Sequence, residues 1–131
     1  MIGLDTNVLV RYVMQDDPKQ SPKATRLIES LTAEAPGFVP LVVLIELIWV
    51  LSACYDLNRE QVAQALEALM RAKEIALDRA EQVAQALRTF RTSSADFADC
   101  LIERTAAAVG CEKTVTFDVG TVKGAGMVLL T

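Results

Sequence analysis

Acidic residues at the ends or in the middle of apolar runs are the chemically suggestive feature of this sequence. Asp5 follows IGL, Glu46 interrupts LVVLIELIWVL, and Asp118 follows TVTF. Asp96 and Asp99 are three residues apart, so both lie on one face if this segment is helical. Carboxylates of this kind bind hard divalent cations or act as general acids and bases.

Glu46 poses the sharpest question. In a helix its neighbours three and four positions away are all apolar, namely Val42, Val43, Trp49 and Val50. We therefore expect a core helix in which no polar face shelters this carboxylate. Burying an ionised carboxylate without a partner costs several kcal/mol, so a compensating cation is expected nearby.

Composition removes several other kinds of chemistry. The 131 residues include no histidine, which excludes Ser-His and Cys-His pairs and the usual zinc ligand. The three cysteines (Cys54, Cys100 and Cys111) show no C-x-x-C spacing and are interpreted as buried apolar residues in a reducing compartment. A net charge of −4 argues against a broadly basic surface for nonspecific DNA binding.

Short apolar runs alternate with longer amphipathic segments. Strands are expected at residues 2–4, in FVP (38–40), EIAL (74–77), TVTF (114–117) and MVLL (127–130). Helices are expected from Thr6 to about Met14, from about Ser21 to Ala33, over 41–54, after Asn58, over 79–91 and over 96–109. Expected helix boundaries include caps at Thr6, Asn58 and Asp78 and a C-terminal glycine at 110.

This alternation predicts an α/β fold in a single domain, residues 1–131. About five short strands would form a mostly parallel central sheet, flanked by helices on both sides. Ligands of such sheets bind outside the carboxyl ends of the strands, so the acids of four segments should converge on one crevice. Individually, Asp5 and Asp96 could instead be helix caps and Asp118 a turn residue.

A cluster of ionised carboxylates needs compensation. No Lys or Arg lies within five residues of Asp5 or Glu46, although protonation of one or two acids would also relieve the repulsion. An all-oxygen ligand set favours Mg²⁺ or Mn²⁺. One or two such ions held by carboxylates catalyse in-line hydrolysis of phosphodiesters, which predicts a nuclease.

IGLDTNVLV, the lone Glu46, ADFADCLIERTAAAVGC and TVTFD, in this order, resemble the PIN-domain ribonucleases, and the length and composition resemble the VapC-type toxins of toxin–antitoxin pairs. The resemblance implies endonucleolytic cleavage of RNA dependent on Mg²⁺ or Mn²⁺, a homodimer, and inhibition by a small cognate antitoxin. It assigns metal binding and catalysis to Asp5, Glu46, Asp99 and Asp118, and positioning of ligands or substrate to Thr6, Asn7 and Thr116. Asp96 remains either a cap or a peripheral metal ligand.

Two alternatives stay open from the sequence: a catalytically inactive PIN-like binding module, and a Mg²⁺-binding phospho-acceptor receiver domain. The N-terminus lacks the features of a signal peptide, and Pro36, Gly37 and Pro40 interrupt the apolar stretch 35–55, so a cytoplasmic protein without a membrane span is expected. The choice of RNA would depend on exposed basic residues such as Arg11, Lys73, Arg79 and Lys123.

Overall fold

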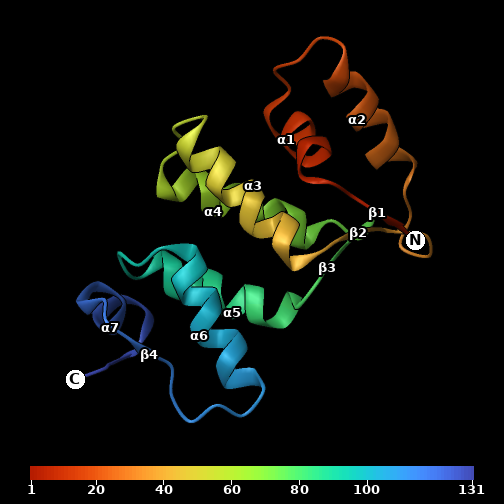
Figure 1. Ribbon diagram of the computed structural model, residues 1–131. Coiled ribbons are helices and arrows are strands. Elements are labelled where there is room, and N and C mark those ends of the chain that lie inside the picture. Colours follow the sequence, from red (N-terminus) through yellow and green to blue (C-terminus); the bar gives the residue numbers. More distant parts are fainter. The chain divides into compact units, whose positions relative to one another are not determined.

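Helices and strands alternate along the chain in the computed structural model, which describes residues 1–131 (Figure 1). The chain divides into two compact units, an N-terminal unit of Met1–Asp78 and a C-terminal unit of Arg79–Thr131. No helix combines the length and apolar character needed to cross a membrane. The mixed α/β class predicted from the sequence is confirmed.

The N-terminal unit is built on three short parallel strands. They are β1 (Ile2–Gly3), β2 (Gly37–Val39) and β3 (Ile75–Leu77), arranged in the order β1-β2-β3. Parallel strands need long crossovers, which here are helical. The first crossover contains α1 (Thr6–Met14) and α2 (Gln20–Ser30), and the second contains α3 (Leu41–Ala53) and α4 (Arg59–Arg71).

Apolar faces of these four helices form the core of the N-terminal unit. Helix α1 packs against α2 and α3, and α3 packs against α4. The largest side chains that are almost completely buried there are Leu9, Ile28, Val39, Leu44, Leu47 and Leu51. This packing fixes the helix that follows β1 against the helix that follows β2, which are the two helices that carry Asp5 and Glu46 at or near their N-terminal ends.

The C-terminal unit consists of three helices and one pair of strands. Its elements are α5 (Ala80–Arg91), α6 (Phe97–Ala108), β4 (Val115–Thr116), α7 (Val119–Ala125) and β5 (Val128–Leu129). Strands β4 and β5 are parallel, and α5, α6 and α7 pack against one another. Phe90 and Phe97 meet edge to face with ring centroids 5.8 Å apart, which joins α5 to the start of α6.

Most boundaries agree with the sequence prediction to within a few residues. Asn58 caps α4 in a full capping box with Gln61, and Gly110 takes a positive φ of 94° just after α6. Helix α2 ends at Ser30, three residues earlier than expected, because the backbone is already extended at Leu31.

Other expectations were wrong. Asp78 does not cap α5, whose N-cap is Arg79; its carboxylate instead accepts a hydrogen bond from the backbone N–H of Leu41 (3.1 Å), at the start of α3. Only Cys100 is buried, whereas Cys54 and Cys111 are exposed. Both cysteines lie just after the end of a helix, α3 or α6, and are followed by polar and charged residues. This position explains their exposure better than the apolar character of the thiol does.

Helix α7 was not predicted at all. Two of its seven residues are glycines, which lower helix propensity by roughly 1 kcal/mol each. Packing explains Gly124, because a Cβ atom at this position would lie 2.7 Å from the Cβ of Ala95. The tertiary contact therefore requires a residue that weakens the local helical signal.

Candidate functional site

The two acids of the N-terminal unit are joined by Thr6. Asp5 is the N-cap of α1, and its Oδ1 accepts a hydrogen bond from the backbone N–H of Thr6 (2.7 Å). The hydroxyl of Thr6 donates to Oε1 of Glu46 (3.0 Å), forty residues away on α3. The cap expected at Thr6 thus belongs to Asp5, and Thr6 is the first helical residue, with a buried side chain that holds the second carboxylate.

Glu46 itself is exposed, which corrects the expectation of a buried charge. Helix α3 buries one face only, made by Val43, Leu44, Leu47 and Leu51. The same helix leaves Val42 and Trp49 67% and 64% exposed, so apolar residues occur on its open side as well. Because α3 is apolar on both sides, its sequence does not indicate which side faces the solvent. Glu46 lies on the exposed side, so its carboxylate needs no buried counter-ion.

Asp5 and Glu46 line a common cavity of about 470 Å³. Thr6 and Asn7 follow Asp5 in the first turn of α1, and the other lining residues come from the middle of α1 and from the C-terminal end of α3 with the two residues after it. The complete lining is Asp5, Thr6, Asn7, Val10, Arg11, Glu46, Val50, Cys54 and Tyr55. The cavity therefore combines two acceptor carboxylates with an amide, a hydroxyl and a guanidinium.

Arg11 is held in this wall by three side chains. Its Nε donates to Oε1 of Gln20 (2.8 Å), and its Nη1 donates to Oδ1 of Asp16 and to the hydroxyl of Tyr55 (3.3 Å each). Tyr55 in turn donates to Oδ2 of Asp16 (2.7 Å). This hydrogen bond holds the pKa of Asp16 below its ordinary value of 3.8, and Arg11 lowers it further.

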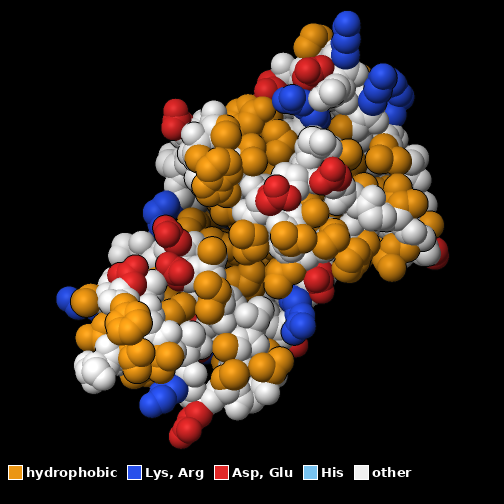
Figure 2. Space-filling view, in the orientation of Figure 1, with side chains coloured by type: hydrophobic (Ala, Val, Ile, Leu, Met, Phe, Trp, Pro, Cys, Tyr) orange, Lys and Arg blue, Asp and Glu red, His pale blue; other side chains and the backbone are white.

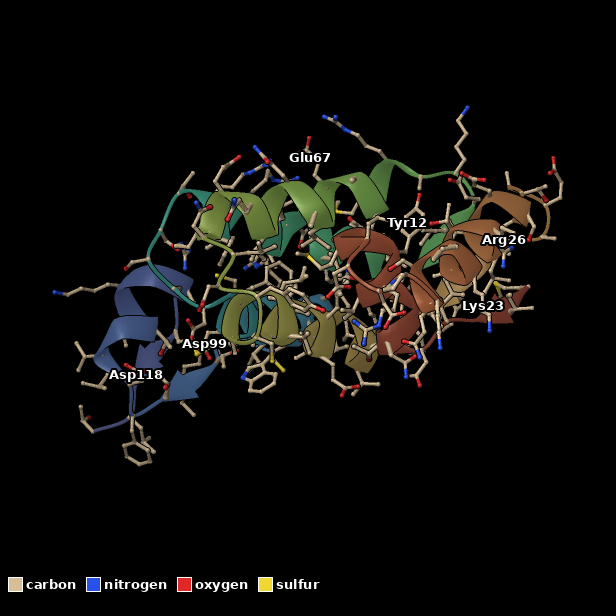
Figure 3. The ribbon with its side chains drawn as sticks, turned by 90° about the horizontal axis from the view of Figure 1, so that it is seen from above. Tyr12, Lys23, Arg26, Glu67, Asp99 and Asp118 are labelled. Atoms are coloured by element: carbon tan, nitrogen blue, oxygen red, sulfur yellow. The ribbon has the colours of Figure 1, made fainter.

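The C-terminal unit carries a second group of acids. Asp96 is at the N-cap position of α6, although its side chain makes no capping bond, and Asp99 lies in the first turn of the helix. Asp118 is the N-cap of α7 and accepts from the backbone N–H of Gly120 (2.8 Å). Figure 3 shows Asp99 and Asp118 in this part of the chain. The turn role considered for Asp118 is thus a helix cap.

Electrostatic repulsion is visible at Asp99. Burial raises the pKa of this carboxyl group above its ordinary value, and the negative charges of Asp96 and Asp118 raise it further. Asp99 is therefore close enough to two other carboxylates for their charges to oppose its ionisation. A bound cation would have the reverse effect and favour the charged form.

Two threonines hold the segment that carries Asp118. The hydroxyl of Thr116 accepts from the backbone N–H of Asp118 (3.0 Å) and from the hydroxyl of Thr121 (3.2 Å). Thr121 is only 5% exposed and was not recognised from the sequence. Thr121 lies three residues after the N-cap Asp118, a spacing typical of a side chain in the first turn of a helix. This spacing could be interpreted only if α7 had been predicted, which it was not. Thr116 therefore orients the fourth acid through the backbone.

The four predicted acids lie in two pairs, one in each unit. Asp5 and Glu46 share the bond network of Thr6, whereas Asp99 is coupled to Asp118 and also to Asp96. Neither unit by itself brings three acidic, Cys or His side chains together as ligands of one ion. The oxygen-only donors suit Mg²⁺ or Mn²⁺, and the mutual repulsion of the negative charges around Asp99 also favours a bound cation. The meeting of both pairs at one crevice stays a prediction.

A single protein family matches segments of both units. The family model for the PIN domain matches residues 2–123, a range that begins in β1, ends in α7 and includes all four acids. A search of curated proteins found no match to the chain. Because this one family accounts for nearly the whole sequence and for segments of both units, the chain belongs to the PIN-domain family.

Proposed function

We propose that this protein is an endoribonuclease that depends on Mg²⁺ or Mn²⁺ and acts as the toxin of a toxin–antitoxin pair. PIN domains are generally nucleases, and divalent metals are their usual cofactors. The observation that carries the proposal is the pair of carboxylates joined by Thr6. This one buried residue donates hydrogen bonds to the acid before α1 and to the acid of α3, and both acids line the same cavity. The family assignment favours this function over a receiver domain.

We propose further that both units form one domain, residues 1–131, in which all four acids share one site. Asp5, Glu46, Asp99 and Asp118 would hold the metal, with Asp96 as a cap or peripheral ligand. The bound ion would activate a water molecule and offset the negative charge of the scissile phosphate. Support comes from the family match, which includes both acid pairs.

The chain's own residues would do the remaining work. Thr6 fixes the orientation of Asp5 and Glu46, and Thr116 fixes the segment of Asp118. Asn7 is exposed beside Asp5 and lines the same cavity, so its amide can donate to a phosphate oxygen. Preorganised groups of this kind lower the barrier because they need not reorient during the reaction.

Cleavage is tested with purified, antitoxin-free protein and a labelled RNA in Mg²⁺, Mn²⁺ or EDTA. We expect cleavage only with metal, and its loss in Asp5→Asn and Glu46→Gln proteins that remain folded by circular dichroism. Glu34→Gln, which changes an exposed acid in a loop outside the cavity, is the matched control and should cleave normally. Cleavage that persists in EDTA or in Asp5→Asn protein would refute the metal-dependent mechanism.

A shared metal site can be tested without any activity. Substoichiometric Mn²⁺ broadens the amide NMR signals of residues near it, so we expect losses around Asp5 and Glu46 together with losses around Asp99 and Asp118. Broadening confined to one unit would contradict a site formed by both. Titration of Mn²⁺ into the folded protein without any heat of binding would instead favour the inactive PIN-like module.

Partners and location complete the proposal and rest on the resemblance to VapC-type toxins. We propose a homodimer in the cytoplasm that is inhibited by a small antitoxin. An antitoxin arginine would find bidentate acceptors in the carboxylates of Asp5 and Glu46. Light scattering measures the dimer, and co-purification with the product of a neighbouring gene identifies the antitoxin.

A further inference from the structure

A second, smaller cavity lies beside the one that contains Asp5 and Glu46. It is formed by α1 and α2, has a volume of about 280 Å³, and shares Asn7 and Arg11 with its larger neighbour. The two cavities are therefore adjacent. The remaining lining residues are Val8, Gln20, Lys23, Ala24 and Leu27.

The two cavities differ in their charged residues. Both charged residues of the smaller cavity, Arg11 and Lys23, are basic, whereas the larger cavity combines the shared Arg11 with two acids, Asp5 and Glu46. Figure 2 shows basic side chains gathered over the surface formed by α2, and Figure 3 shows Lys23 and Arg26 on this helix. An anion is thus favoured next to the acidic site even though the protein as a whole carries a net charge of −4.

Arg11 is already oriented for such an anion. Gln20, Asp16 and Tyr55 hold its Nε and Nη1, but Nη2 has no hydrogen-bond partner in the protein. A guanidinium fixed in this way loses little side-chain entropy when it binds a phosphate oxygen. Lys23 adds a second, more flexible charge on the opposite helix of the cavity.

The other walls are apolar and small. Val8, Ala24 and Leu27 line the cavity, and none of its side chains is aromatic. Its volume of about 280 Å³ lies near the lower end of the range of small-ligand pockets, so it can hold at most one nucleotide and not a longer segment. Cationic and amide groups next to a small apolar wall match a phosphate joined to a sugar and base.

We propose that this cavity binds one nucleotide of the RNA next to the cleavage position. Its phosphate contacts Nη2 of Arg11 and Nζ of Lys23, and its sugar or base lies against Val8, Ala24 and Leu27. The inference rests on the proposed ribonuclease function and adds to it how the substrate is held. Because phosphate contacts carry no sequence information, the contacts of Arg11 and Lys23 contribute affinity to every RNA, and Arg11 does not take the part in target choice that was expected from the sequence.

Binding is measured by fluorescence anisotropy with a labelled single-stranded RNA and the 131-residue chain carrying Asp5→Asn, a substitution that prevents cleavage. Loss of one phosphate contact lowers the slope of log affinity against log salt by about 0.7 for single strands, so Lys23→Gln should show this change. Arg26→Gln removes a charge from the same helix outside the cavity and is the matched control. It should leave the slope unchanged.

Arg11→Lys is the second variant. It keeps the charge but loses the planar fork that three side chains hold, so we expect weaker RNA binding with little change in the salt slope. Circular dichroism checks that this protein is folded; if it is not, Lys23→Gln alone decides the outcome. Binding by Lys23→Gln that equals that of Arg26→Gln, in both affinity and slope, overturns the inference.

Cleavage kinetics separate this inference from the proposed function. In an otherwise wild-type chain, Lys23→Gln should raise KM and leave kcat unchanged, as expected for a contact made equally in the ground and transition states. If the wild-type protein cleaves no RNA with any metal, the ribonuclease proposal fails, while the anisotropy experiment still tests nucleotide binding. If wild-type cleavage is normal and Lys23→Gln has the same KM, only the nucleotide site is wrong.

Discussion

The free energy that the hydrogen bond from Thr6 to Glu46 contributes can be measured with a single substitution. Thr6→Val removes the hydroxyl but keeps the shape of the side chain and the backbone N–H that binds Asp5. Hydrogen bonds to charged groups contribute about 1.5–3 kcal/mol, but Glu46 is exposed and water can replace the lost donor, so we expect a coupling of about 1 kcal/mol.

The same amount of free energy sets the expected effect on catalysis. Because each 1.36 kcal/mol corresponds to a factor of ten in rate, Thr6→Val should lower kcat/KM for RNA roughly fivefold to tenfold. Thr6→Ser keeps the hydroxyl and is the matched control, which should retain most of the activity. The assay is the initial rate of cleavage of a fluorogenic RNA at saturating Mn²⁺.

A double-mutant cycle gives the coupling independently of activity. Urea unfolding of Thr6→Val, Glu46→Ala and the double variant in metal-free buffer should yield a coupling of roughly 0.5–1.5 kcal/mol. The two residues share a direct bond, so their effects should not be additive. Additive effects on stability, or equal loss of activity in the Ser and Val variants of Thr6, would refute the role assigned to this bond.

Two further predictions concern the fold. Gly124→Ala should destabilise the protein by about 1–3 kcal/mol in urea unfolding, because the new Cβ would lie 2.7 Å from that of Ala95; unchanged stability would show that this approach is not tight. Since Tyr55 lowers the pKa of Asp16, this contribution to stability is present above the ordinary pKa of 3.8 and is lost as the pH falls through the lower folded value. Tyr55→Phe should therefore be less stable at pH 7 and lose less stability between pH 4 and pH 2, and a parallel pH profile for both proteins would contradict this linkage.

Local patterns were sufficient to predict most of the secondary structure. Short, continuous apolar runs predicted the strands, and Asn58 and Gly110 predicted helix ends, because caps and left-handed residues act within a few positions of the chain. Helix α7 escaped this reasoning because Gly124 is dictated by Ala95, a residue far away in sequence. Asp78 was misassigned for the same reason, since its partner Leu41 belongs to another helix.

The sequence by itself determined which residue types are available for chemistry: acids at the ends of strands, no histidine, and an order of motifs typical of the PIN-domain family. Only the tertiary structure decided that Thr6 joins Asp5 to Glu46, that Glu46 is exposed, and that Arg11 is fixed in the wall of the acidic cavity with its Nη2 free. These features depend on which face of α3 is buried and on contacts between residues up to 44 positions apart. An apolar run such as LVVLIELIWVL carries no periodic signal from which such contacts could be read.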